Sequence, residues 1–260
     1  MTDQEKKGTG EDAENLAEGT LLSHLVELRQ RLLKISAAVV LVFIALLPFS
    51  TRIFSLVSAP LREVLPGNAM IATAVASPLL TPFKLTFFVA LFIAMPVVLY
   101  QVWAFVAPGL YRKEKRFAFP LLASSIVLFY AGIAFAYFVV FPLMFSFFTS
   151  IAPEGVEVQT DIALFLDFII TIVFAFGIAF EVPVATVLIV WTGLVKLEKL
   201  KSARPYVFLG AFVVGMFLTP PDVISQTLLA VPVYLLYEVG ILMAKIFAVR
   251  EEPAEQTEKP

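Results

Sequence analysis

Few side chains in this 260-residue sequence could carry chemistry, and most of them are carboxylates in unusual places. Cysteine is absent and His24 is the single histidine. Disulfides, thiolate nucleophiles and cysteine-ligated metals are therefore excluded, and little remains for a histidine-based metal site. Glu27 and Glu114 stand among basic residues, whereas Glu181 and Glu238 stand inside apolar segments. Carboxylates in these positions favour cation binding or proton exchange over covalent catalysis.

Glu27 belongs to the stretch SHLVELRQRL, residues 23–32, directly before the first long apolar segment. On a helix the leucines of this stretch share one face, while His24, Glu27 and Arg31 share another. The spacing predicts an interfacial helix whose polar face is turned toward water. Glu27 then either pairs only with Arg31, an exposed contact that contributes roughly a few tenths of a kcal/mol, or binds a cation that another molecule supplies.

Glu114 is surrounded by basic residues in the stretch LYRKEKRF. Coulomb attraction from these neighbours keeps its carboxylate ionised. One interpretation is that Glu114 only dilutes a positive topology signal. The other is that it receives a guanidinium at the membrane interface, the strongest common side-chain hydrogen-bond pairing.

Polar side chains inside the apolar segments need a separate explanation. A carboxylate in the bilayer is costly, so Glu181 and Glu238 are expected to face a protein interior or a wet cavity, and they are candidates for function. Asp222 and Gln226 stand at the start of the last apolar segment. They are candidates for hydrogen bonds across to another helix.

The composition shows what must position these groups. Hydrophobic residues make up 60% of the chain and charged residues 15%, and the mean hydropathy is +0.90. The apolar residues come in long blocks, and a membrane span needs about 20 of them. These features predict an all-α integral membrane protein with six transmembrane helices, and prolines at 96, 142, 183 and 232 predict kinks within them. We expect the spans at residues 31–50, 84–108, 118–142, 165–191, 205–220 and 226–246.

Basic residues indicate the orientation of the chain in the membrane. All but three of the 19 Lys and Arg residues fall in the chain ends or in the loops after the second and fourth spans. The exceptions are Arg52, Arg62 and Lys84. The positive-inside rule therefore places both termini in the cytoplasm. We expect an acidic, disordered cytoplasmic tail over 1–20, a six-helix transmembrane domain over 21–248 and a polar cytoplasmic tail over 249–260.

Two other functional classes are consistent with intramembrane acids. An ion-coupled secondary transporter would use Glu181 and Glu238, but the internal repeat that many such transporters carry is not visible. An intramembrane protease would need a catalytic pair at membrane depth, and one histidine at the membrane edge cannot supply a Ser–His pair there. No phosphate-binding loop of the G-x-x-x-x-G-K type occurs in the sequence.

Several motifs, in order along residues 21–248, resemble the TatC family, the receptor subunit of the twin-arginine protein translocase. These motifs are SHLVELRQRLL, VSAPL, MIATAVASP, YQVWAFVAPGLY, FEVPV, RPYVFLGAFVVGM and LTPPDVISQTLLAVP. The resemblance implies a cupped arrangement of six helices with both termini in the cytoplasm. It also implies a receptor that has no cofactor and is not an enzyme, in a bacterial cytoplasmic membrane.

The resemblance assigns roles to individual residues. It implies that Glu27, Glu114 and Phe105, together with Arg29, bind the signal peptide of a folded cargo protein, whose hallmark is a pair of arginines. Glu181 matches the family's intramembrane glutamate. Glu238 also remains a candidate intramembrane polar group.

The resemblance also implies partners. Asp222 and Gln226 match a polar pair expected to contact a partner helix. The implied partners are the single-span subunits TatA and TatB, the lipid bilayer and other copies of the chain, with no nucleic acid. Transport would be driven by the proton-motive force.

Overall fold

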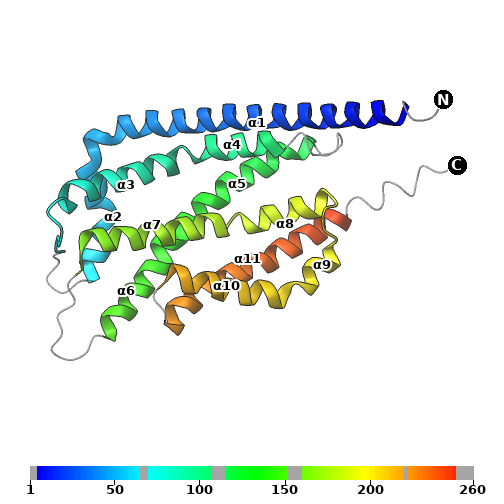
Figure 1. Cartoon of the computed structure of the whole chain (residues 1–260). Helices are drawn as coiled ribbons and strands as arrows, with labels where there is room; N and C mark the ends of the chain where they lie inside the picture. The colour runs from blue at the N-terminus through cyan, green and yellow to red at the C-terminus, as the bar shows by residue number, and fades with distance from the viewer. Residues whose placement is uncertain (1–4, 65–69, 107–114, 152–159, 220–221, 250–260) are drawn as a thin grey trace.

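The computed structural model describes the backbone of residues 5–64, 70–106, 115–151, 160–219 and 222–249, and side chains over 24–59, 70–105, 119–151, 160–219 and 222–246. All the named secondary-structure elements in these ranges are helices (Figure 1). The helices are α1 (Glu5–Leu46), the 3-10 helix η1 (Leu47–Phe49), α2 (Ser50–Val64), α3 (Ser77–Ile93), α4 (Met95–Val106), α5 (Lys115–Phe135), the π-helical segment η4 (Ala136–Val140), α6 (Phe141–Ser150), α7 (Ile162–Ala179), α8 (Val182–Trp191), α9 (Leu197–Ser202), α10 (Arg204–Leu218) and α11 (Val223–Val249).

These helices contain the six apolar segments that the sequence predicts. Four helical stretches are long and apolar enough to cross a membrane: 24–59, 119–150, 162–191 and 223–246. The pair α3 and α4 forms a fifth, bent span. The sixth segment, α10, has only 15 residues, as its short apolar run indicates, and such a helix requires a locally thinned bilayer or cover from its neighbours.

The N-terminal segment differs from the expectation. α1 begins at Glu5, so the backbone of residues 5–20 is helical and continuous with the first span, where the composition predicts a disordered tail. The stretch EDAENLAE at residues 11–18 contains several good helix formers, which favour extension of the helix. The domain limits at residues 20 and 248 stay predictions.

Helix irregularities occur beside three of the four prolines expected to kink the spans. α3 and α4 are bent by 50° at a break just before Pro96, which confirms that kink. The π-helical segment η4 ends just before Pro142, and the break between α7 and α8 lies just before Pro183. Each proline removes a backbone hydrogen bond, so the chain bends or widens in the preceding turn. Pro232 differs, because α11 continues through it as one helix.

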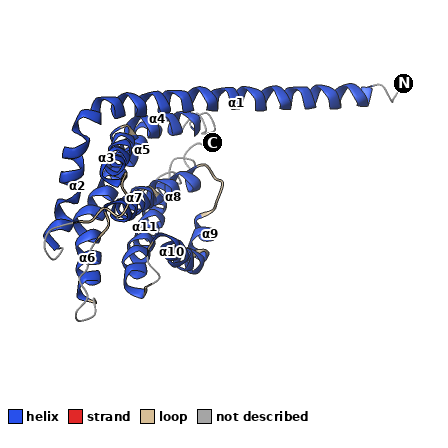
Figure 2. Cartoon of the chain, turned by 60° about the vertical axis from the view of Figure 1, so that its left-hand side comes forward, coloured by secondary structure: helices blue, strands red, loops and turns tan. Residues whose placement is uncertain are grey.

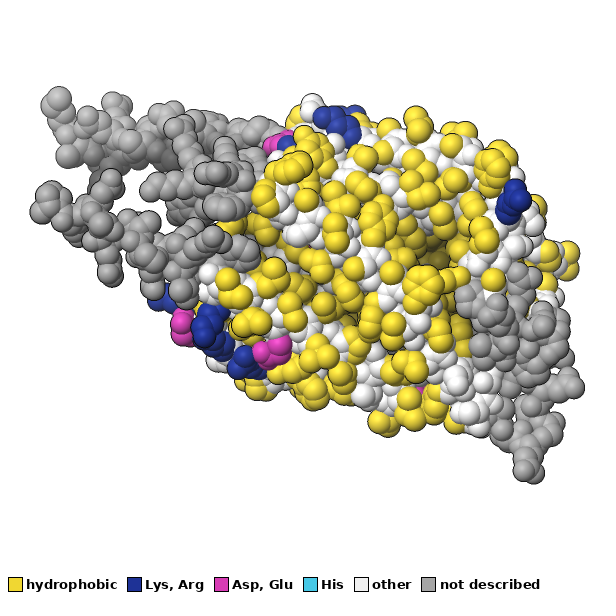
Figure 3. All heavy atoms as spheres, turned by 180° about the vertical axis from the view of Figure 1, so that it is seen from behind, with side chains coloured by type: hydrophobic (Ala, Val, Ile, Leu, Met, Phe, Trp, Pro, Cys, Tyr) yellow, Lys and Arg dark blue, Asp and Glu magenta, His cyan; other side chains and the backbone are white. Residues whose placement is uncertain are grey.

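The helices cross each other and do not form a parallel bundle. α3 and α4 lie beside α1, the chain of α5, η4 and α6 runs obliquely past α7, and α8 and α10 pack against α11 (Figures 1 and 2). α9 and the C-terminal end of α11 lie at the same end of the molecule as the N-terminal half of α1, whereas α2 and α6 lie at the opposite end (Figure 1). Hydrophobic side chains cover most of the face in Figure 3, and charged side chains gather at its margins.

A large cluster of buried hydrophobic side chains lies where η4 and α6 meet α7. Phe141, Phe145 and Phe165 are buried there, and the ring centroids of successive pairs are 5.8 Å apart, a separation typical of favourable aromatic contacts. In a membrane this packing contributes mainly dispersion energy, because lipid tails are as apolar as the side chains they replace.

Glycines allow α5 and α7 to approach closely. A Cβ atom on Gly132 of α5 would lie 2.5 Å from the carbonyl oxygen of Phe176 in α7. In turn, a Cβ atom on Gly177 of α7 would lie 2.7 Å from the ring of Phe129 in α5. The two helices therefore interlock through reciprocal contacts that a larger residue would prevent.

Asp161 joins the segment before α3 to the start of α7. Its Oδ1 accepts hydrogen bonds from the backbone N–H groups of Ala163, at 2.8 Å, and Leu164, at 3.2 Å, and so caps the helix. Its Oδ2 accepts from the backbone N–H of Thr73 at 2.9 Å and from the Thr73 hydroxyl at 2.7 Å. These bonds, the Thr73 hydroxyl first, lower the pKa of Asp161 to about 2.

The close approach of α5 and α7 predicts the effect of a single methyl group. Changing Gly132 to Ala forces the methyl against backbone atoms of α7 that cannot move aside, and overpacking of this kind costs about 1–3 kcal/mol. We expect the purified protein in detergent to unfold at a lower temperature. Gly210→Ala is the control, because a Cβ there meets nothing within 4 Å. Equal stability of the two variants would contradict the interlocked packing.

The hydrogen bonds of Asp161 predict a pH dependence. Because its pKa falls from the ordinary 3.8 to about 2, the ionised carboxylate stabilises the fold above about pH 4, and this contribution is lost as the pH falls toward 2. Asp161→Asn keeps an oxygen for the cap but leaves Thr73 without that acceptor. We expect the Asp161→Asn protein in detergent to unfold at a lower temperature than the parent at about pH 6. On acidification its unfolding temperature should then fall less than that of the parent.

A second variant separates the two donors on Thr73. Thr73→Val removes the hydroxyl and keeps the backbone N–H, so its acid sensitivity should lie between those of the parent and Asp161→Asn. An Asp161→Asn protein that keeps the full acid sensitivity of the parent would show that another group is responsible.

Candidate functional site

Glu27 lies on the polar face of α1 and pairs with Arg31 of the same helix. Arg31 donates to Glu27 Oε1 from Nε at 3.0 Å and also from Nη2. The Glu27 side chain is 37% exposed, whereas that of Arg31 is 20% exposed. The structure therefore contains the intrahelical pair that the spacing predicts, and it leaves Glu27 accessible from outside the protein.

Arg31 also connects α1 to α4. Its Nη1 donates to Gln101 Oε1 at 3.3 Å, and its Nη2 donates to the carbonyl oxygen of Ala104 at 3.0 Å. Gln101 is buried, and sequence reasoning missed it. The signal was present, because Gln101 is an amide within a long uncharged run.

Phe105 is brought to the same place by the last turn of α4. Its ring stacks on that of His24, with centroids 4.3 Å apart and an interplanar angle of 29°. Arg29 is exposed on α1. Two predicted site residues, Glu27 and Phe105, therefore gather where α1 lies along α4 (Figures 1 and 2), whereas Glu114 lies outside the described residues.

This arrangement can bind a cation. Glu27 already holds one guanidinium, and a carboxylate can accept several hydrogen bonds through its two oxygens. The aromatic pair beside it offers an apolar surface for the neighbouring part of a ligand. No group of three or more His, Asp or Glu residues that could hold a metal occurs among the described residues.

Glu181 lies at the break between α7 and α8. The hydroxyl of Ser125, a buried residue of α5, donates to Glu181 Oε2. Glu181 Oε1 is buried and has no hydrogen-bond partner among the described residues. Glu181 therefore faces the protein interior, as the cost of burying a carboxylate predicts.

Asp222 and Gln226 lie at the start of α11 and form hydrogen bonds within the chain. Asp222 Oδ1 accepts from the backbone N–H of Ser225 at 2.7 Å, and Gln226 Nε2 donates to the carbonyl oxygen of Phe212 in α10 at 2.7 Å. Gln226 thus holds α10 against α11. Asp222 Oδ2 and the Ser225 hydroxyl are buried without a partner in the described part of the chain.

Glu238 is paired in the middle of α11. Arg204 Nη2 donates to Glu238 Oε2 at 2.7 Å, and the Tyr234 hydroxyl donates to Oε1 at 2.9 Å. Arg204 begins α10, so this ion pair ties the start of α10 to the middle of α11. These contacts give Glu238 a structural role.

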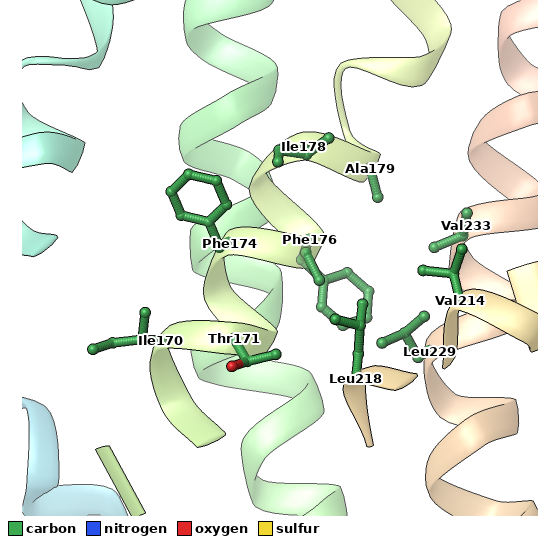
Figure 4. Close-up of a pocket in the computed structure, with 11 residues that line it drawn as sticks. Ile170, Thr171, Phe174, Phe176, Ile178, Ala179, Val214, Leu218, Leu229 and Val233 are labelled. Atoms are coloured by element: carbon green, nitrogen blue, oxygen red, sulfur yellow. The ribbon is translucent and has the colours of Figure 1, made fainter. Parts of the chain in front are cut away.

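A pocket that sequence reasoning missed opens between α7, α10 and α11. Its volume is about 520 Å³ and its lining is apolar apart from Thr171. Figure 4 shows side chains from three helices around it, among them Phe176 of α7, Val214 of α10 and Leu229 of α11. No sequence motif marks the pocket, because it depends on how the helices cross. Its lining can accommodate apolar side chains or lipid tails.

Comparisons with known proteins give the family. The profile of the family described as Sec-independent protein translocase protein (TatC) matches residues 23–232. A TatC protein of Azotobacter chroococcum mcd 1 is 63% identical over 235 residues, which are 90% of this chain and 92% of that protein. The TatC protein of Escherichia coli K12 is 58% identical over 87% of this chain and 88% of its own length.

Solved structures agree with the sequence comparisons. A crystal structure of the twin arginine translocase receptor TatC is 36% identical, with a TM-score of 0.77 over 86% of this chain and 98% of that chain. A second crystal structure of that receptor, in DDM, is 35% identical, with the same TM-score. These comparisons confirm the family resemblance and the six-helix membrane fold. The chain therefore belongs to the TatC family of Sec-independent protein translocase proteins, which are translocase components and not enzymes.

Proposed function

We propose that this protein is the membrane receptor of the twin-arginine translocase and that it binds the signal peptides of folded cargo proteins where α1 lies along α4. The observation that carries the proposal is the Glu27 carboxylate, which is 37% exposed and already accepts hydrogen bonds from a guanidinium. Guanidinium is the group that a pair of arginines presents. The related crystal structures are described as twin arginine translocase receptors, which supports the same function.

Two arginines require two acceptors. Glu27 is the first, and Glu114, in the basic segment that follows α4 in the sequence, is the second. Carboxylates suit this task because a guanidinium can donate two parallel hydrogen bonds to them, which a lysine ammonium cannot reproduce. Phe105, stacked on His24 of α1, supplies apolar contact to the peptide, and Arg29 is exposed on the same helix.

The binding surface faces the cytoplasm in this proposal. The basic residues of α9 and of the chain ends favour the cytoplasmic side by the positive-inside rule, and α9 lies at the same end of the molecule as the N-terminal half of α1 (Figure 1). Both termini are then cytoplasmic, and the membrane is the bacterial cytoplasmic membrane. The receptor needs no cofactor, and transport is driven by the proton-motive force.

The receptor nucleates a complex with the single-span subunits TatA and TatB and with other copies of itself. The start of α11 supports this part of the proposal, because Asp222 Oδ2 and the Ser225 hydroxyl are buried polar atoms without a partner among the described residues. A polar side chain on a partner helix would pair with them once that helix displaced the groups that cover them. Gln226 helps to fix the shape of this surface, because it holds α10 against α11. Glu181 supplies a further intramembrane polar group for transport.

The paired carboxylates predict a loss of peptide binding. Changing Glu27 or Glu114 to Gln keeps the size of the side chain but removes its charge. A hydrogen bond to a charged group contributes about 1.5–3 kcal/mol. We expect each change to weaken binding of a synthetic twin-arginine signal peptide by roughly one order of magnitude, the lower end of that range, because the site is partly exposed to water.

Glu198→Gln provides the matched control. Glu198 is exposed on α9 and lies outside the proposed surface, so this change alters the net charge equally and should leave the peptide affinity as in the parent. Fluorescence anisotropy with a labelled peptide and the purified protein in detergent measures all the affinities. Parental affinity in both Glu27→Gln and Glu114→Gln would exclude these carboxylates as the arginine acceptors.

The orientation predicts where a reporter enzyme is active. Alkaline phosphatase, which is active only outside the cytoplasm, should be active when fused after Ile151 and inactive when fused after Lys199. A fluorescent protein that matures in the cytoplasm should give the opposite pattern at the same two sites. Phosphatase activity at Lys199 together with inactivity at Ile151 would invert the topology and remove Glu27 from the cytoplasmic face.

A further inference from the structure

Arg31 already provides Glu27 with the kind of group that the proposed ligand carries. Both of its hydrogen bonds to Glu27 reach the same oxygen, Oε1. An incoming arginine therefore meets a carboxylate whose charge is partly neutralised by a guanidinium from the same helix. To meet the full charge of the carboxylate, any cation of the ligand, whether arginine or lysine, must displace Arg31 from Glu27.

Arg31 can leave Glu27 without losing all of its partners. Its Nη1 and Nη2 also donate to Gln101 Oε1, at 3.3 Å, and to the carbonyl oxygen of Ala104, at 3.0 Å. These acceptors belong to α4 and do not depend on Glu27. The Arg31 side chain is also 20% exposed, so water can hydrate the N–H groups that it frees. A small rotation of the guanidinium would open Glu27 while Arg31 stays bound to α4.

We propose that Arg31 is an internal competitor that occupies Glu27 in the unloaded receptor and gives way to an arginine of the bound peptide. This inference rests on the proposed role of Glu27 in peptide binding. It gives Arg31 a definite effect on affinity. Such a ligand binds only when the internal partner is absent. Its apparent affinity is then its intrinsic affinity multiplied by the fraction of time that the partner is absent.

Competition of this kind lowers every ligand's affinity by the same factor. It therefore leaves the ratio between an arginine peptide and a lysine peptide unchanged, but moves both toward weaker binding. The consequence is a threshold. Peptides with two well-placed arginines still bind, while peptides with poorer contacts remain unbound at the same concentration.

The decisive variant is Arg31→Lys, which preserves the charge of α1. Lysine cannot donate from a planar fork to Glu27, Gln101 and Ala104 together, so it competes less well for the carboxylate. We expect the purified full-length protein to bind a synthetic twin-arginine peptide roughly two- to tenfold more tightly. A twin-lysine version of the peptide should gain by the same factor. Arg31→Gln should give a larger increase for both peptides.

Two controls separate competition from other effects. Lys34→Gln removes a positive charge from an exposed position on the same helix, so the gain from Arg31→Gln must exceed the gain that it produces. In a Glu27→Gln background, Arg31→Lys should have no effect, because the contested carboxylate is gone.

The outcomes are distinct. Parental or weaker peptide binding by Arg31→Lys, with Glu27→Gln still weakening it, would overturn the competitor role alone and make Arg31 a positioning residue. A changed ratio between the arginine and lysine peptides would also overturn it. Parental affinity in Glu27→Gln would overturn both this inference and the role of Glu27 on which it rests. Tighter binding by the same factor for both peptides, abolished in the Glu27→Gln background, would support it.

Discussion

A bilayer offers no hydrogen-bond partner to a protein backbone, and each unpaired backbone group in hydrocarbon costs several kcal/mol. The chain meets this constraint by forming helices, which pair their backbone groups internally. Where a proline interrupts a helix, the irregularity stays short: a 50° bend before Pro96 and a break of two residues, Phe180 and Glu181, before Pro183. At the second break one of the two residues left outside regular helix is Glu181, and its side chain faces protein, where Ser125 donates to it.

The lipid bilayer also removes the hydrophobic effect, the force that usually holds helices together. Lipid tails are as apolar as leucine, so contact between spans must come from close packing and from hydrogen bonds. The structure uses both. Gly132 and Gly177 let α5 and α7 interlock. Gln226 donates from α11 to a backbone carbonyl of α10, and Glu238 in the middle of α11 pairs with Arg204 at the start of α10. α10 has only 15 residues, so these bonds fix a helix too short to span a bilayer of ordinary thickness.

Polar groups in such a protein divide into those satisfied within the chain and those left open. Asp161 and Glu238 are satisfied, which explains their presence without a ligand. Glu181 Oε1 and Asp222 Oδ2 are buried without a partner among the described residues, so they are where a partner or a proton has an energetic reason to act. Glu27 belongs to neither group, because its partner Arg31 has two further acceptors on α4. A contact that can be exchanged at low cost suits a receptor that must bind and release its cargo.

Composition and residue order alone determined the all-helical membrane fold, the six apolar segments and the family, because hydropathy, proline positions and local motifs are properties of contiguous residues. The intrahelical pair of Glu27 with Arg31 was also predictable, since four residues always bring two side chains to one helical face. Only the tertiary structure decided that Arg31 reaches Gln101 on α4, that Gln226 faces α10, and that α7, α10 and α11 line a common pocket. These contacts depend on how helices cross. Crossing is set by side-chain packing between segments far apart in the chain, which no local pattern records.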